Sequence, residues 1–181
     1  VHRDEIGEAV LNYLKGNVSK SIAARYRVWH EFRNAENPRP LIILVGGTSG
    51  VGKTSVSVAL ANLLKISRVA ATDEIREVMR LMIGPNLIPT LHASSYAAWE
   101  KISTPPPENV DPVIYAFREQ ATRVCVGVKG TIERALEENV SLVLDGIHLI
   151  PELINLDAYG KQAIVIQVNL YLSDMQFYVE R

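Results

Sequence analysis

The sequence predicts an α/β protein, with a mainly parallel sheet between two layers of helices and a short helical segment in front of it. One observation is the run 41–45, which is apolar at every position, as in a strand buried on both faces, and which ends at two glycines. The other is that further apolar runs alternate with amphipathic helical patterns along the rest of the chain. Strands of this kind occur in parallel sheets that helices cover on both faces.

A pair of prolines divides the chain. Residues 1–37 hold two amphipathic helical patterns, and Pro38 and Pro40 then break the helical periodicity. We therefore expect an N-terminal helical segment over 1–37 and a larger α/β domain over 38–181.

Periodicity and capping residues predict the elements of the larger domain. A helix is expected over 53–65, with inward-facing apolar side chains at Val56, Leu60, Leu63 and Leu64. Asp111 followed by Pro112 is typical of a helix start, since the first residue caps and the second suits the first turn. The other expected elements are a strand at 68–71, a helix from Thr72, a short helix over 94–101, a helix from Asp111 to about Glu138, and strands at 141–144 and 163–172.

Composition limits the classes of function. The 181 residues are 48% hydrophobic and 22% charged, as in a globular protein, and the formal net charge of −1 provides no basic field for nucleic acid. No apolar run approaches the roughly 18 residues of a membrane span. The single cysteine, Cys125, has no internal disulfide partner, and no Cys/His cluster has zinc spacing. We expect a cytoplasmic protein without nucleic-acid or membrane partners, and the sequence leaves its oligomeric state open.

One motif dominates the sequence. It fits G-x-x-x-x-G-K-[ST] and comprises Gly47, Thr48, Ser49, Gly50, Val51, Gly52, Lys53 and Thr54. A buried strand is expected before it and a helix after it, which is the context of a phosphate-binding loop, or P-loop. Glycines let backbone N–H groups approach phosphates, while Lys53 would reach the β- and γ-phosphates, Thr54 would bind Mg²⁺ and Ser55 would support the α-phosphate. The motif thus predicts ATP and Mg²⁺ as cofactors and a P-loop NTPase fold.

An acidic residue lies at the end of the strand expected at 141–144. Asp145 comes directly after this apolar run, and strands of a parallel sheet end at the edge where ligands bind. Beside a P-loop, an acid in this place holds Mg²⁺ together with Thr54. The alternative is a strand-end aspartate that forms an ordinary turn with Gly146.

The helix from Thr72 offers groups for a phosphoryl acceptor. Asp73, Arg76 and Arg80 are spaced three and four residues apart, so they share one helical face. Asp73 would orient or deprotonate an acceptor hydroxyl, and the two arginines would bind phosphate or carboxylate. The alternative is a solvated helix face with ordinary charge pairs. Lys53, Asp73 and Asp145 are thus the catalytic candidates.

Other polar residues are weaker candidates for acceptor binding. His92, Ser95 and Tyr96 lie in the irregular middle of the domain, where helix capping would explain them equally well. Gln120 and Arg123 lie one turn apart on the long helix, and His148 follows Asp145 by three residues; a surface pair and a structural histidine are the alternatives.

Four segments resemble a known family when they are taken together and in order. They are 41–55, 71–80 (A-T-D-E-I-R-E-V-M-R), 89–96 (P-T-L-H-A-S-S-Y) and 144–151 (L-D-G-I-H-L-I-P). The order and spacing of these segments over 40–174 resemble those of the archaeal 2-phosphoglycerate kinases.

The resemblance implies transfer of the γ-phosphoryl group of ATP to 2-phosphoglycerate, giving ADP and 2,3-bisphosphoglycerate. Such an acceptor carries a phosphate and a carboxylate, which suits Arg76 and Arg80. Residues 1–34 resemble the last two helices of an ATP-cone regulatory domain. Family members more often have Glu at position 145 and continue past Arg181 into an arginine-bearing lid, to which 174–181 are expected to belong.

Two other functions remain open from the sequence. One is another small-molecule P-loop kinase, such as one for shikimate or a nucleoside. The other is an ATP-binding regulatory module that performs no acceptor chemistry.

Overall fold

The structure, a computed structural model, describes residues 3–35 and 38–173. It divides into two units, Val1–Arg39 and Pro40–Arg181, which are described separately below. The division lies two residues from the boundary expected at 37 and 38. The expected lid residues 174–181 lie outside the described part of the chain.

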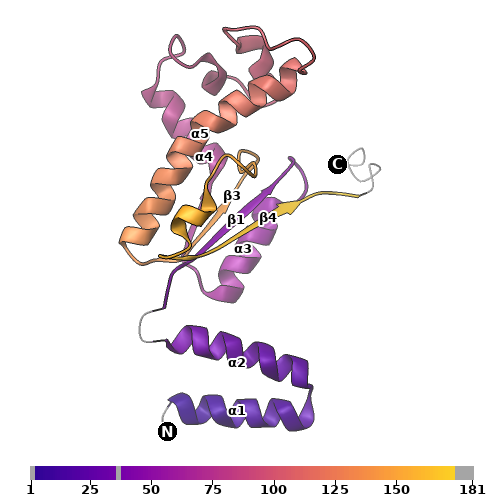
Figure 1. The fold of residues 1–181 in the computed structure, drawn as a ribbon, viewed down its shortest axis with the longest axis vertical. Helices are drawn as coiled ribbons and strands as arrows, with labels where there is room; N and C mark the ends of the chain where they lie inside the picture. The colour runs from indigo at the N-terminus through magenta and orange to yellow at the C-terminus, as the bar shows by residue number, and fades with distance from the viewer. Residues whose placement is uncertain (1–2, 36–37, 174–181) are drawn as a thin grey trace. The chain divides into compact units, whose positions relative to one another are not determined.

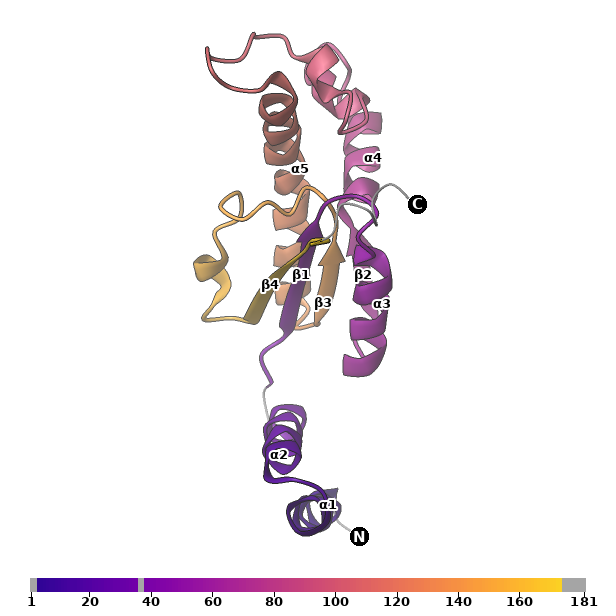
Figure 2. The same cartoon turned by 90° about the vertical axis from the view of Figure 1, so that its right-hand side faces the viewer.

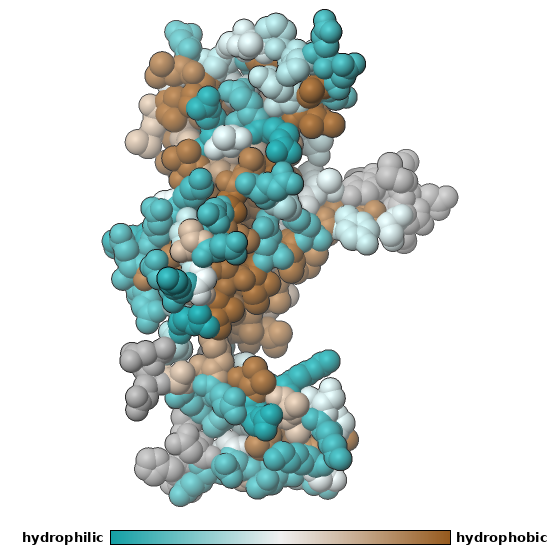
Figure 3. Space-filling view, in the orientation of Figure 1, coloured by the Kyte–Doolittle hydropathy of each residue, from teal (hydrophilic) through white to brown (hydrophobic). Residues whose placement is uncertain are grey.

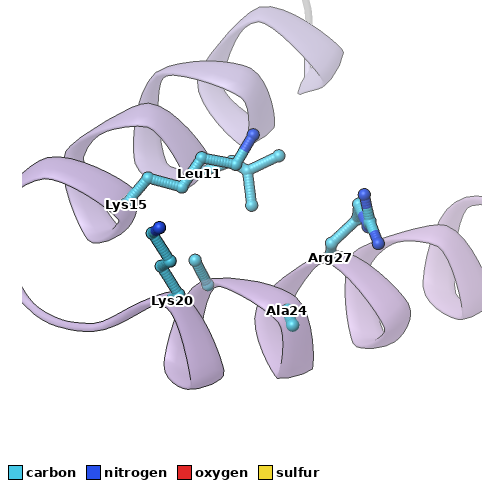
Figure 4. A pocket seen from close by; sticks show the side chains of 6 residues that line it. Leu11, Lys15, Lys20, Ala24 and Arg27 are labelled. Carbon is cyan, nitrogen blue, oxygen red and sulfur yellow. The ribbon is translucent and has the colours of Figure 1, made fainter.

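The N-terminal unit is a pair of helices, α1 (Arg3–Asn17) and α2 (Lys20–Asn34), that pack against each other (Figure 1). Ser19 caps α2, because its hydroxyl accepts a hydrogen bond of 3.2 Å from the backbone N–H of Ile22. An open pocket of about 340 Å³ lies between the two helices, and its lining includes the cationic side chains of Lys15, Lys20 and Arg27 (Figure 4). The resemblance of this unit to part of an ATP cone stays a prediction.

Over residues 40–173, the larger unit has four parallel strands in the order β2-β3-β1-β4. They are β1 (Leu41–Gly47), β2 (Arg68–Ala71), β3 (Leu142–Asp145) and β4 (Ile164–Leu170). Because the strands are parallel, their carboxyl ends meet at one edge of the sheet (Figure 2). The strands expected from the sequence are all present, and β3 includes Asp145 as its last residue.

Helices cover both faces of this sheet. Figure 2 shows α3 (Lys53–Leu64) on one side and α5 (Pro112–Glu137) on the other, with α4 (Thr72–Met82) beside α5. On the α5 side, Val124, Val128 and Ile132 form one core with strand residues such as Leu44 and Leu144. The expected three-layer α/β fold of P-loop proteins is therefore confirmed.

The inward face of α3 differs from the expectation. Leu63 is 75% exposed and Val56 is 36% exposed, whereas Ser57 and Ala61 are buried. Because α3 begins directly after the glycine-rich turn, that turn fixes the rotation of the helix about its axis. The small side chains of Ser57 and Ala61 then allow close packing on the sheet, and two of the large apolar residues stay outside.

The segment between α4 and α5 is less regular than the sequence predicts. The short helix expected over 94–101 is reduced to a 3₁₀ turn, η2 (Ala98–Lys101), and another turn, η1 (Pro89–His92), precedes it. The expected start of α5 is confirmed, because the Asp111 carboxylate accepts hydrogen bonds from the N–H groups of Val113 and Ile114. A third turn, η3 (Leu156–Tyr159), precedes β4.

Two glycines allow close approaches that position the cleft described below. A Cβ at Gly127 of α5 would lie only 2.4 Å from Ile75 Cγ2, so the missing side chain is what lets α4 pack closely on α5. Gly146, directly after β3, has φ +149°, and a Cβ there would lie 1.7 Å from Thr72 Oγ1. The end of β3 and the start of α4 therefore touch at a position where only glycine fits.

The sheet is unequally covered. Apolar side chains gather over the middle of the larger unit, where β4 lies (Figure 3), and Ile166 and Val168 of this edge strand are 43% and 37% exposed. Strands β1 and β3, in contrast, have buried residues at nearly every position. The best-covered part of the sheet is thus the pair of central strands that carries the motif residues.

Candidate active site

The glycine-rich turn lies between β1 and α3, at the carboxyl edge of the sheet. Gly50 and Gly52 have φ values of +80° and +86°, a region that side-chain-bearing residues rarely adopt, and nothing lies within 4 Å of where their Cβ atoms would be. Gly52 is the N-cap of α3 and provides no side-chain cap, so the helix begins without a capping side chain from that position. This turn therefore presents backbone donors to a concave space, as a phosphate site requires.

Lys53 is the first residue of α3. Its Nζ donates a hydrogen bond of 2.6 Å to the backbone oxygen of Thr48, which holds the ammonium group against the turn. Lys53 also lines the cleft that opens from the turn. A single positive charge is thus placed beside the backbone donors.

Asp145 lies next to this turn, since it pairs in register with Val45 of β1. Only 4% of the residue is exposed, and burial raises the pKa of its carboxyl above the ordinary value. The nearby hydroxyls of Ser57 and Thr54, and then the Lys53 ammonium, oppose that rise. Ser57 Oγ approaches the carboxylate but completes no hydrogen bond of normal geometry, and it remains a buried hydroxyl without a partner.

The group around Asp145 fits a magnesium ion. A buried carboxylate beside a hydroxyl is stabilised by a cation, and the unpartnered Ser57 hydroxyl leaves an acceptor unused. Within 3–35 and 38–173, no group of three or more His, Cys, Asp or Glu side chains could hold a metal ion alone. Magnesium in nucleotide sites needs no such group, because phosphates and water supply most of its ligands.

One cleft of about 960 Å³ joins the two predicted halves of the site. The phosphate turn forms one wall, and the start of α4 and residues 94–96 form the other. The cleft lining includes the following residues named from the sequence: Ser49, Gly50, Gly52, Lys53, Thr54, Ser55, Asp73, Arg76, Ser95, Tyr96 and Asp145. Gly47, the last residue of β1, and Thr48 and Val51 of the turn are not among the lining residues.

We call the second wall the acceptor wall and define it as Asp73, Arg76, Glu77, Ser95 and Tyr96. The Asp73 side chain is 64% exposed. Arg76 is only 16% exposed; its Nη1 donates to the backbone oxygen of Ala93 at 2.6 Å, and its Nη2 pairs with Glu77 at 3.0 Å. Arg76 Nε is buried and has no partner. The wall thus offers one exposed carboxylate and one guanidinium, which is paired with Glu77.

Arg80 also pairs with Glu77, from Nε to Oε2 at 2.5 Å, but it does not line the cleft. Glu77 therefore bridges the two arginines that the sequence assigns to acceptor binding. The sequence analysis did not name Glu77 as a site residue, although its place one residue after Arg76 and three before Arg80 was a usable signal.

His148 and Gln120 lie behind the acceptor wall. Both are 0% exposed, and neither lines the cleft. His148 Nε2 is 3.2 Å from Gln120 Oε1, and His148 Nδ1 is 2.9 Å from Thr72 Oγ1. Burial lowers the pKa of His148 from 6.5 to about 4, an effect that Asp73 opposes and Arg76 reinforces, so the ring is neutral near neutral pH.

Two other predicted residues lie apart from the cleft lining. His92 Nε2 is 2.7 Å from the backbone oxygen of Ile83. Arg123 Nε lies 3.9 Å from Glu119 Oε1 in an exposed pair along α5. Thr72, which the sequence analysis named only as the start of a helix, is the first residue of α4, and its hydroxyl lies 2.9 Å from His148 Nδ1.

Comparison with known proteins gives consistent relatives. The chain is 39% identical to the 2-phosphoglycerate kinase of Methanothermobacter thermautotrophicus over 94% of its own length and 55% of the relative's. It is 40% identical to the 2-phosphoglycerate kinase of Pyrococcus furiosus over 87% of its length and 51% of the relative's. The chain thus spans about half the length of the curated relatives it matches.

The solved structures and family models add little to these relatives. A candidate kinase from Chloroflexus aurantiacus matches with a TM-score of 0.46 and 20% identity, over 79% of this chain and 67% of that one. No family model matches the sequence. Among the helices of the described residues, none is long and apolar enough to cross a membrane.

Proposed function

Because the chain is related over most of its length to archaeal 2-phosphoglycerate kinases, we propose that it transfers the γ-phosphoryl group of ATP to the hydroxyl of 2-phosphoglycerate. The observation that carries this proposal is the cleft shared by the phosphate turn and the acceptor wall. A donor site alone would fit any P-loop protein, whereas a facing wall with a guanidinium and a carboxylate fits an anionic alcohol.

On the donor side, the turn would hold the ATP phosphates through its backbone N–H groups and Lys53. Residues 47–55 would form this site, with Ser55 near the α-phosphate. Thr54 and Asp145 would hold Mg²⁺, which neutralises charge on the phosphates. Asp145 suits this role, since its carboxylate is buried and lies near the Thr54 hydroxyl and the Lys53 ammonium.

On the acceptor side, Arg76 would bind the phosphate or carboxylate of the substrate. Arg76 lines the cleft and its side chain is only partly exposed, so its guanidinium would bind an oxyanion there through charge-assisted hydrogen bonds. Ser95 and Tyr96 line the same wall and offer hydroxyl groups. Arg80 would act at longer range through Glu77, and His92 and Arg123 remain weaker predictions for this site.

Asp73 would orient the acceptor hydroxyl and accept its proton. Its carboxylate lies in the same cleft as Lys53, and its side chain is largely exposed. Phosphoryl transfer then needs little more than alignment and charge neutralisation, which Lys53 and Arg76 supply from opposite walls.

The test is ADP release by the full-length chain with Mg·ATP. We expect 2-phosphoglycerate to stimulate ADP formation, with the equimolar appearance of a doubly phosphorylated product in ³¹P NMR, and 3-phosphoglycerate to serve as the control acceptor. Stimulation by shikimate or a nucleoside instead would identify another small-molecule kinase. ATP binding without stimulation by any of these acceptors would contradict the proposal and favour a regulatory module.

A further inference from the structure

We infer that His148 and Gln120 are positioning residues, which join the end of β3 to the acceptor wall without contacting the acceptor. For the identity of the acceptor we rely on the proposed function, whereas the structural link depends only on the contacts below. Both residues are fully buried and absent from the lining of the cleft, although the sequence places them among the candidates for substrate contact.

The orientation of the Gln120 amide is fixed by its neighbours. Gln120 Nε2 donates to the backbone oxygens of Thr90 at 2.5 Å and of Ala93 at 3.1 Å. Carbonyl oxygens only accept hydrogen bonds, so the reverse orientation would place two oxygens against a third. The Gln120 Oε1 atom therefore faces Ser95 and His148, and it accepts a hydrogen bond of 2.7 Å from the Ser95 hydroxyl.

This orientation determines which nitrogen of His148 carries the proton. Gln120 Oε1 can only accept, so His148 Nε2, at 3.2 Å, is the protonated nitrogen. In the neutral ring Nδ1 is then an acceptor, and the Thr72 hydroxyl donates to it at 2.9 Å. The order of donors and acceptors is thus defined from Thr72 through His148 to Gln120.

The same tautomer leaves Asp73 available. Asp73 Oδ1 is 3.8 Å from His148 Nδ1, but a nitrogen without a proton donates nothing to it. The carboxylate therefore keeps its acceptor capacity for a hydroxyl in the cleft. If the ring were protonated instead, it would attract Asp73 and compete with the acceptor.

The network also holds the part of the wall that Arg76 uses. The backbone oxygen of Ala93 accepts hydrogen bonds from both Gln120 and Arg76. Gln120 and Arg76 thus hold the turn at 90–95 through the same carbonyl group. Because His148 follows Asp145 by three residues, the segment after the predicted magnesium ligand is tied to the turn that supports Arg76 and Ser95.

The first experiment compares Gln120→Met with Val124→Ala in the full-length chain. Both residues are fully buried on α5, but Val124 is an apolar core residue and takes no part in the network. We expect Gln120→Met to raise the KM for 2-phosphoglycerate by about tenfold or more through misplacement of the wall, with ATP affinity within about twofold. We expect Val124→Ala to leave both unchanged. Equal KM values for Gln120→Met and wild type would overturn the inference.

A second pair of variants tests the same network with smaller changes, in case Gln120→Met does not fold. Thr72→Val keeps the shape of the side chain and removes only its hydroxyl, whereas Thr72→Ser retains the donor. We expect Thr72→Val to raise the acceptor KM and Thr72→Ser to restore it toward the wild-type value. The same KM for both variants would mean that the hydroxyl has no positioning role.

Two measurements need no activity. Nitrogen-15 NMR of the imidazole should find His148 as the Nε2–H tautomer near neutral pH, and the Nδ1–H tautomer would refute the network. Amide exchange over 90–97 should be faster in Gln120→Met than in Val124→Ala. If 2-phosphoglycerate gives no ADP but both measurements agree with expectation, the proposed function fails while the positioning network stands.

Discussion

The two walls of the cleft differ in the groups that form them, which are backbone groups in one and side chains in the other. The phosphate turn is made of backbone, in which Gly50 and Gly52 adopt positive φ and α3 begins without a side-chain cap. The acceptor wall is made of side chains from α4 and residues 95–96, and side chains of α5 and of the segment after β3 support it from behind. The first wall depends on local geometry, and the second depends on the packing of the whole unit.

This difference explains why P-loops carry a short sequence signature and acceptor sites do not. A backbone site needs particular residues at fixed spacing, because only glycine adopts the required dihedral angles without strain. A side-chain site needs only that the right groups meet, and many arrangements of segments achieve this. The predictions below separate the two walls by substitution.

The largest effect is expected at the phosphate turn. Lys53→Ala should lower kcat by at least about a hundredfold, because it removes a charge aimed at the transferring phosphoryl group. Coupled ADP detection measures it, and Lys161→Ala, which removes an exposed lysine of the η3–β4 loop, is the charge-matched control. A Lys53→Ala protein with near-normal turnover would contradict the assignment of this wall to ATP.

The second effect concerns stability and the buried histidine behind the acceptor wall. His148 has a pKa of about 4 in the folded chain against an ordinary 6.5. Between pH 4 and pH 6.5 the unfolded chain therefore binds more protons than the folded chain. The contribution of His148 to the free energy of unfolding is complete above pH 6.5 and is lost as the pH falls toward 4. The loss is at most about 3 kcal/mol.

Urea unfolding at several pH values in this window measures that contribution. We expect the unfolding free energy of wild type to fall more steeply on acidification than that of His148→Gln, which cannot take up a proton there. Identical slopes for the two proteins would show that His148 is not the buried neutral group described above.

A third effect should appear in the acceptor KM alone. Arg76→Ala should raise the KM for 2-phosphoglycerate by about tenfold or more, because a charge-assisted hydrogen bond is lost, while Mg·ATP affinity measured by calorimetry stays nearly unchanged. Arg118→Ala provides the control, since this arginine is 51% exposed and pairs with Glu152. Wild-type values of both acceptor parameters in Arg76→Ala would show that Arg76 does not bind the acceptor.

The smallest effect is expected at the other arginine of α4. Arg80 is 42% exposed, pairs with Glu77 and does not line the cleft. Arg80→Ala should therefore change the acceptor KM by less than about threefold, as is usual for an exposed ion pair. Steady-state kinetics with Arg76→Ala and Arg80→Ala side by side would rank the two, and an equal rise in KM would mean that Arg80 reaches the acceptor directly.

The sequence was sufficient for the parts of the fold that local patterns determine. It predicted the four strands, the start and end of α5, and the place of the P-loop between a buried strand and a helix. It was wrong about α3, where Leu63 points to solvent, because the helix rotation follows from the preceding turn and not from the apolar residues themselves.

The candidate site could also be predicted only in part, because local spacing reveals some of its residues and tertiary packing determines the others. Asp73, Arg76 and Ser95 were named from helical spacing or loop position, and the structure brings them to one cleft with Lys53. The placement of Gln120 and His148 behind that cleft was out of reach, because spacing along a helix does not tell which face meets a buried histidine 28 residues away in sequence. Thr72 was missed for a similar reason, because its hydroxyl hydrogen-bonds to the ring of His148, which is far away in the sequence.

The contact between α4 and α5 affects the distance between the positive charges on the two walls of the cleft. Ile75 of α4 sits where the side chain of residue 127 would otherwise be, directly before Arg76 in the sequence. A methyl group at 127 would act as a wedge and move the guanidinium relative to the lysine across the cleft. The distance between the two charges is thus adjustable from α5, a helix that contributes no residue to the lining of the cleft.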